Sequence, residues 1–184
     1  MRRAAFLKKL VFWASAAFFP LMFGPSVPAL ASHLLLKFGE DPVLSISDKT
    51  GPFTLNFSNF LKDSVSNTET VVYEIRANNL SAGSVAGTVS ARIDSLMQDM
   101  NLEADVAGYE NIGHDDFSNL QEAESGYIAV TASNTALANK VPGSGTGDNQ
   151  MEGNLTVNWR GKLTTDAPFG QQSRSLIVTI KEGN

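Results

Sequence analysis

The chain has 184 residues, of which 42% are hydrophobic and 18% charged, with a formal net charge of −5 at pH 7 and no cysteine. An acidic protein is repelled by phosphate backbones, so we expect no nucleic-acid partner. The absence of cysteine excludes disulfides, thiolate nucleophiles, Cys-based zinc sites and iron–sulfur clusters. Packing and sheet hydrogen bonds must therefore stabilise the fold.

The first 31 residues have the pattern of a secretory signal peptide. Four basic residues precede an apolar segment at 10–23, and Ala29 and Ala31 match the A-x-A cleavage pattern. The segment contains a proline and is shorter than the roughly 20 residues of a membrane-spanning helix. We expect cleavage before Ser32, a mature domain over 32–184 with no stable membrane span, and a secreted, periplasmic or cell-surface location.

Short strand patterns separated by turn signals fill the predicted mature chain. Alternating apolar and polar residues predict a half-buried strand, because successive side chains point to opposite faces of a sheet. The predicted strands lie at 43–47, 53–57, 71–77, 88–94, 102–106, 127–132, 154–160 and 175–180. Loops are predicted at 48–52, 62–70, 77–87 and 141–153, where turn-forming or polar residues gather.

Three further segments give other signals. Residues 96–100 are compatible with a helical turn, and 117–123 with a short helix inside an acidic, irregular stretch. Residues 133–140 fit neither a strand nor a helix clearly.

Many short strands at roughly even spacing are typical of a β-sandwich or a small barrel. We expect an all-β, mostly antiparallel sandwich of immunoglobulin-like or jelly-roll type, formed by a single domain over 32–184. The two strongest patterns are 154–160 and 175–180, and we expect their apolar residues to share one core. These residues are Leu155, Val157 and Trp159 in the first pattern and Leu176, Val178 and Ile180 in the second.

The sequence lacks a catalytic signature. Its two histidines are His33 and His114, and no G-x-S-x-G nucleophile motif accompanies them. Two distant histidines are also too few for a typical zinc site. We predict no catalytic, cofactor-binding or metal-binding residues and no enzymatic activity, and we interpret His114 as a loop residue.

Loop 145–153 is the strongest candidate for a cation. Asp148, Asn149 and Glu152 carry the oxygen ligands that calcium prefers, although their spacing differs from that of an EF-hand. We interpret the loop as solvated and keep calcium binding as an alternative.

The C-terminal residues Ala167-Pro168-Phe169-Gly170 and Leu176-Ile177-Val178-Thr179-Ile180 resemble the ending of cysteine-free fimbrial and capsule-like subunits. The resemblance implies an incomplete immunoglobulin-type sandwich whose N-terminal extension donates a strand to a neighbouring subunit. Here that extension would be 33–47.

Two function classes follow. In the first, the protein is a secreted or cell-surface structural subunit of fimbrial type, whose copies or partner subunits join by strand addition across an exposed edge. In the second, it is a monomeric extracellular module that binds a glycan, a peptide or calcium through its loops.

Overall fold

The computed structural model describes residues 43–78, 80, 87–166 and 171–182, and every strand in it belongs to the unit Ser32–Asn184. The predicted signal peptide at 1–31 lies outside the described residues. Within them the chain forms strands, turns and loops and contains no helix. The strands are β1 (Val43–Asp48), β2 (Glu69–Asn78), β3 (Gly87–Ile93), β4 (Met100–Asn111), β5 (Asn119–Glu122), β6 (Ile128–Val130), β7 (Thr135–Val141), β8 (Met151–Leu163) and β9 (Leu176–Glu182).

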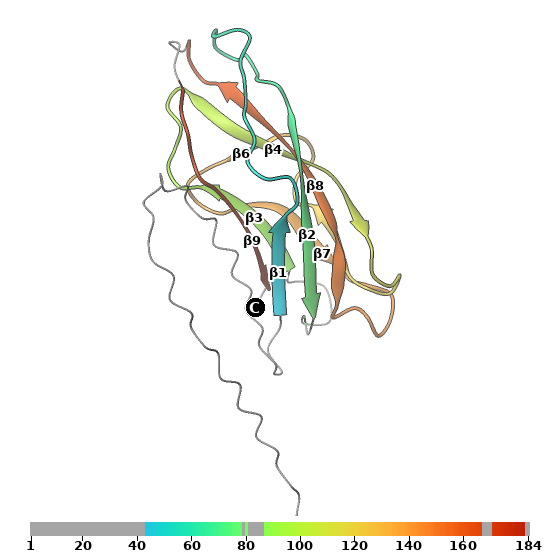
Figure 1. The fold of residues 1–184 in the computed structure, drawn as a ribbon. Helices are drawn as coiled ribbons and strands as arrows, with labels where there is room; N and C mark the ends of the chain where they lie inside the picture. The colour runs from blue at the N-terminus through green and yellow to red at the C-terminus, as the bar shows by residue number, and fades with distance from the viewer. Residues whose placement is uncertain (1–42, 79, 81–86, 167–170, 183–184) are drawn as a thin grey trace, which may run out of the picture. The chain divides into compact units, whose positions relative to one another are not determined.

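The strands form two antiparallel sheets that face each other across one core (Figure 1). The five-stranded sheet has the order β1-β2-β8-β4-β6, and the four-stranded sheet has the order β5-β7-β3-β9. Every strand pair in both sheets is antiparallel. The predicted all-β sandwich is therefore confirmed.

Strand β8 is the centre of the five-stranded sheet, between β2 and β4. Its residues alternate between buried and half-buried along the whole strand, as the period of two predicts. Leu155, Val157 and Trp159 are each 0% exposed. The prediction that this pattern lines the core is confirmed.

Two glycines on the inner face of β8 leave room for aromatic side chains. A Cβ at Gly153 would lie 2.3 Å from the Tyr109 ring and 2.5 Å from the carbonyl oxygen of Glu110, and a Cβ at Gly161 would lie 2.7 Å from the Phe57 ring. The missing side chains are part of the packing, because real Cβ atoms do not approach other atoms this closely.

The helix predicted at 117–123 is wrong. Residues 119–122 are strand β5, which pairs with β7, and Ser118 and Leu120 are buried. Apolar residues three apart resemble a helical face, but pairing with β7 satisfies the same backbone groups within the sheet. The ambiguous segment 133–140 is the partner strand, since β7 covers 135–141.

The helical turn predicted at 96–100 is also wrong. This segment is a bend that ends where β4 begins at Met100, and Asp99 has a φ of 59°. Asp is one of the few residues other than glycine that adopts this left-handed conformation readily. It reverses the chain in place of a helical turn.

The strand predicted at 53–57 is replaced by an extended segment outside both sheets. Phe53, Leu55 and Phe57 are half-buried and alternate with exposed residues, so the expected period is present. Asn67 takes the place of a partner strand. Its side-chain Oδ1 accepts from the N–H of Asn56 at 2.6 Å and its Nδ2 donates to the carbonyl of Thr54 at 3.3 Å, while its backbone N–H donates to the carbonyl of Asn56 at 3.0 Å.

Candidate functional site

The sheet edges are the sites at which the described fold offers unpaired backbone groups. The five-stranded sheet ends in β1 and β6, and the four-stranded sheet ends in β5 and β9. β6 has 3 residues and β5 has 4, too few to support a long new pairing. β1 has 6 residues and β9 has 7, and these two edges contact each other across the sandwich (Figure 1).

Strand β9 has a defined set of outward-facing backbone groups. The N–H of Asp94 donates to the carbonyl of Ser175 at 3.0 Å, in register with the pair Ile93 and Leu176. Hydrogen-bonded and non-hydrogen-bonded pairs alternate in an antiparallel ladder. Leu176, Val178 and Ile180 therefore direct their N–H and C=O groups away from β3, toward the edge where no described strand pairs.

The side chains of β9 are apolar on both faces of the sheet. Leu176, Val178 and Ile180 pack against the core but remain half-buried, and Ile177 on the opposite face is half-buried too. Thr179 and Lys181 are exposed. An edge strand with this composition and length is a template for pairing with another strand. The expected packing of the second strong pattern against the core is confirmed, but at an edge and with partial burial.

Strand β1 is a more polar edge. Leu44 and Ile46 are half-buried against the core, whereas Ser45 and Ser47 are exposed. Asp48 ends the strand, and its Oδ1 accepts from the N–H groups of Thr50 at 2.8 Å and Gly51 at 3.0 Å. Such an Asx turn reverses the chain at once, with Gly51 at a φ of 80°.

Charged residues line the outer face of the sheet next to β1. The carboxylate of Glu74 contacts Lys49 and accepts from Arg76 Nε at 2.6 Å, while Arg76 Nη2 lies 3.3 Å from Glu152 Oε1. The hydrogen bond from Lys49 first, and then the contacts with Arg76, lower the pKa of Glu74. Solvated ion pairs of this kind contribute little to stability.

Loop 142–150, which contains the calcium candidate Asp148, is packed against the segment before β5. Asp148 Oδ1 accepts from the N–H of Gly143 at 2.5 Å and from Ser118 Oγ at 3.1 Å, and it lies 3.5 Å from Lys140 Nζ. The side chain of Lys140 is 1% exposed. Gly147 is buried, and a Cβ at this position would lie 2.7 Å from the Phe117 ring.

This geometry differs from the solvated loop that the sequence suggested. The carboxylate of Asp148 pairs with the buried ammonium group of Lys140 and accepts a hydrogen bond from the backbone N–H of Gly143. Glu152 pairs with Arg76. Donors and cations thus already contact the carboxylates of Asp148 and Glu152, whereas the buried side-chain oxygen of Asn149 has no hydrogen-bond partner. No group of three His, Asp or Glu side chains in the described part of the chain could hold a metal ion.

The sequence did not identify Ser118 and Lys140, because nothing local marks a buried polar pair. Lys140 appears in an ambiguous segment, and its partner lies eight residues away across a glycine-rich loop. The cation–π contact between Arg160 and Tyr127, 3.6 Å from guanidinium carbon to ring centre, was missed for the same reason.

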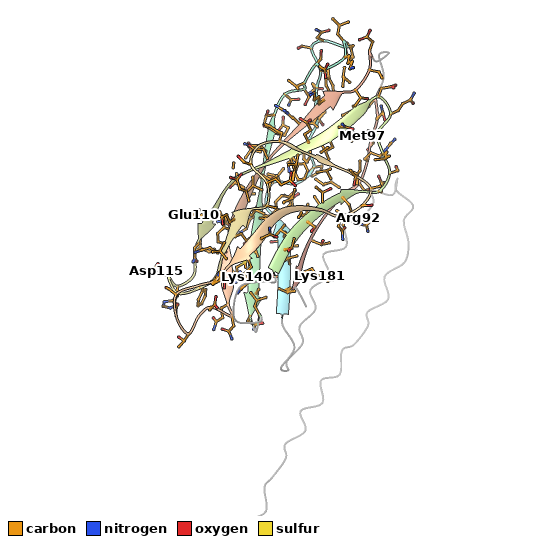
Figure 2. The ribbon with its side chains drawn as sticks, turned by 180° about the vertical axis from the view of Figure 1, so that it is seen from behind. Arg92, Met97, Glu110, Asp115, Lys140 and Lys181 are labelled. Atoms are coloured by element: carbon orange, nitrogen blue, oxygen red, sulfur yellow. The ribbon has the colours of Figure 1, made fainter. Side chains whose placement is uncertain are left out.

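Two other residues considered from the sequence, His114 and Trp159, lie against phenylalanine rings. His114 is exposed, and its ring lies 5.7 Å from that of Phe117. Trp159 is fully buried and stacks on Phe53 at 6.0 Å, so it belongs to the core. His33 lies outside the described residues. Figure 2 shows Lys140 and Lys181 toward one end of the sandwich and Met97 toward the other.

Comparison with known proteins assigns no function to the chain, so a functional proposal must be argued from the fold and its sheet edges. No protein-family model matches the chain, and neither the curated proteins nor the solved structures gave a significant match. In the part of the chain that the structure describes, no helix has both the length and the apolar character needed to cross a bilayer.

Proposed function

We propose that this protein is a secreted or cell-surface structural subunit of fimbrial type, whose copies or partner subunits join by strand addition across an exposed sheet edge. The observation that supports this proposal is strand β9. It combines outward-facing backbone groups at Leu176, Val178 and Ile180 with apolar side chains on both faces. Strand addition uses main-chain hydrogen bonds for affinity and alternate side chains for specificity.

The structure describes only residues 43–47 of the predicted donor segment 33–47. Residues 43–47 form most of β1, which pairs with β2 from Val43 opposite Asn78 to Asp48 opposite Tyr73. This part is used within the chain. A donor role therefore falls to the apolar residues 33–38, which lie outside the described residues.

Hydrodynamic size tests the proposal. We expect the full chain, expressed in an exporting bacterial host, to yield a product that starts at Ser32 and sediments as an assembly at micromolar concentration. Deletion of 33–38 leaves β1 complete, so it tests the donor without removing a strand of the sandwich. Loss of assembly on this deletion would assign the donor role to 33–38, whereas persistence of assembly would leave edge pairing without a donor segment.

A monomer at all concentrations would overturn the proposal and favour the alternative, a binding module that uses its loops. Calcium titration by calorimetry then tests the candidate segment 145–153, of which only 145–150 is a loop because β8 begins at Met151. Asp148→Ala is a poor control because it also removes the contacts with Gly143 and Lys140. Glu152→Gln is better, since the carboxylate of Glu152 contacts Arg76 in a partly exposed ion pair.

A further inference from the structure

We infer that the side chains of Lys140 and Asp148 join in an amide bond, which forms in the folded chain with loss of one water molecule. This cross-link is independent of the proposed function, because it concerns a buried pair and not a sheet edge. The chain has no cysteine and therefore no disulfide. An amide between a lysine and an aspartate side chain is a covalent tie that needs neither cysteine nor an oxidant.

The fold holds the side chain of the lysine in place. Lys140 lies near the end of β7, where it pairs with Leu120 of β5, and its side chain is 1% exposed. Gly87, the first residue of β3, is buried, and a Cβ there would lie 3.1 Å from the Cβ of Lys140. The glycine thus leaves room for the aliphatic part of Lys140, whose Nζ lies 3.5 Å from Asp148 Oδ1.

The carboxylate of Asp148 is held by donors on one of its oxygens. Oδ1 accepts a hydrogen bond from the N–H of Gly143 at 2.5 Å, and Ser118 Oγ lies 3.1 Å from the same oxygen. Ser118 is 0% exposed, and its hydroxyl also donates to the backbone carbonyl of Asp148. Fixed donors of this kind stabilise the negative charge that develops on an oxygen when a nucleophile adds to its carbon.

The reaction balances within the pair, and the ion pair is its starting state. The ammonium group of Lys140 gives one proton to Asp148 Oδ2, and the neutral amine then adds to the carboxyl carbon Cγ. The charge of this intermediate lies on Oδ1, which accepts from the N–H of Gly143. Nζ gives a second proton to the hydroxyl at Oδ2, the bond from Cγ to that oxygen breaks, and water leaves. One N–C bond forms, one C–O bond breaks, and nothing is oxidised or reduced.

Burial and proximity favour the amide over the ion pair. Two buried charges carry a desolvation penalty that their attraction does not always repay, and a neutral amide removes both charges. Groups that are held in a productive orientation react as if at effective concentrations of up to about 10⁵–10⁸ M. The bond closes a ring over residues 140–148 and ties the loop after β7 to the end of that strand.

A second lysine–aspartate pair among the described residues is a matched comparison. Lys162 Nζ lies 3.7 Å from Asp63 Oδ1, close to the 3.5 Å of the buried pair. The side chains of Lys162 and Asp63 are 40% and 66% exposed, against 1% and 19% for Lys140 and Asp148. Water stabilises exposed charges, so we expect the pair of Lys162 and Asp63 to remain ionic.

Mass spectrometry of the natural protein tests the inference. The folded chain is purified, denatured and digested with trypsin, which cleaves after arginine and after lysine with a free amine. Lys140 is the only such residue between Arg92 and Arg160. We expect a single peptide 93–160 that is lighter than its sequence by one water, and normal cleavage after Lys162. Separate peptides 93–140 and 141–160 of full mass would overturn the inference.

The variant Lys140→Arg identifies the source of the lost water. An aspartate can also lose water by cyclising onto the next backbone nitrogen, a reaction that needs no lysine. Arginine keeps the positive charge and the tryptic site but not the reactive amine, so we expect cleavage at position 140 and full peptide masses. Loss of water that persists in Lys140→Arg would overturn the inference.

A comparison of folded and unfolded protein covers the case in which the variant does not fold. We expect natural chain kept in urea from the moment of cell lysis, and isolated from inclusion bodies, to have full mass and to cleave after Lys140. The same material should lose one water after refolding. Loss of water in the chain that has never folded, or full mass after complete refolding, would overturn the inference.

Discussion

Strands β8 and β9 have similar sequences and different surroundings. Each places three apolar residues on its inner face, yet Leu155, Val157 and Trp159 are fully buried while Leu176, Val178 and Ile180 are half-buried. The difference comes from position: β8 lies between β2 and β4, whereas β9 pairs with β3 and ends its sheet. The same alternating pattern thus serves as a core in one strand and as a candidate contact surface in the other.

The largest expected effect is at the most buried residue of β8. Trp159 is 0% exposed and stacks on Phe53, so Trp159→Ala should lower the free energy of unfolding by about 3–5 kcal/mol. Chemical denaturation followed by circular dichroism measures the loss, and Phe53→Ala offers a milder variant if the protein does not fold. A loss below about 1 kcal/mol would show that β8 is not the core strand.

Replacement of the two β8 glycines by alanine should distinguish a contact that cannot move from one with flexible side-chain ends. Gly153→Ala places a methyl group against the Tyr109 ring and the Glu110 carbonyl, and overpacking of this kind costs about 1–3 kcal/mol. Gly161→Ala meets only the ends of the Met100 and Phe57 side chains, which can move, so its loss should be smaller. Denaturation midpoints of the two variants compare them, and equal losses would contradict the distinction.

The same substitution on both strands compares them most directly. Val157→Ala should lower the free energy of unfolding by about 2–3 kcal/mol, because Val157 is 0% exposed. Val178→Ala should cost about 1 kcal/mol, since the side chain is half-buried. Both are measured by urea denaturation at a concentration where the protein is monomeric. A larger loss at Val178 than at Val157 would reverse the assignment of core and edge.

The smallest effect near neutral pH concerns the tyrosines that flank β8. Tyr73 on β2 and Tyr109 on β4 both lie opposite Leu155. Burial raises the pKa of each hydroxyl, helped by the charge of Asp48 for Tyr73 and of Glu152 for Tyr109. The fold therefore favours the protonated phenol.

The sign of the pH dependence follows from this direction. An unfolded tyrosine has a pKa of about 10, so the contribution is complete below that pH and is lost as pH rises toward the higher folded values. Denaturation midpoints should stay constant at neutral pH and fall in strong alkali. The double variant Tyr73→Phe/Tyr109→Phe should weaken that fall, and an unchanged alkaline profile would contradict this cause.

The sequence predicted elements well where the period of two is long, as in 71–77, 88–94, 154–160 and 175–180. It failed where a partner replaces the local preference. The sequence of 117–123 resembles a helix, but pairing with β7 makes 119–122 a strand. The sequence of 53–57 resembles a strand, but its backbone bonds to the side chain and backbone of Asn67 instead of to a neighbouring strand. Ser118, Lys140 and Asp148 could not be grouped from sequence because their contacts join separate loops and strands.

The sequence by itself determined the class of fold, because alternation with period two and the turn residues between the strands are local properties of the chain. It also determined that no disulfide stabilises the protein. Only the tertiary structure decided which strong strand is central and which ends a sheet, since strand order depends on pairings between residues far apart in the chain. For the same reason only the structure showed that β9 directs the N–H and C=O groups of Val178 away from β3, toward an edge at which no described strand pairs.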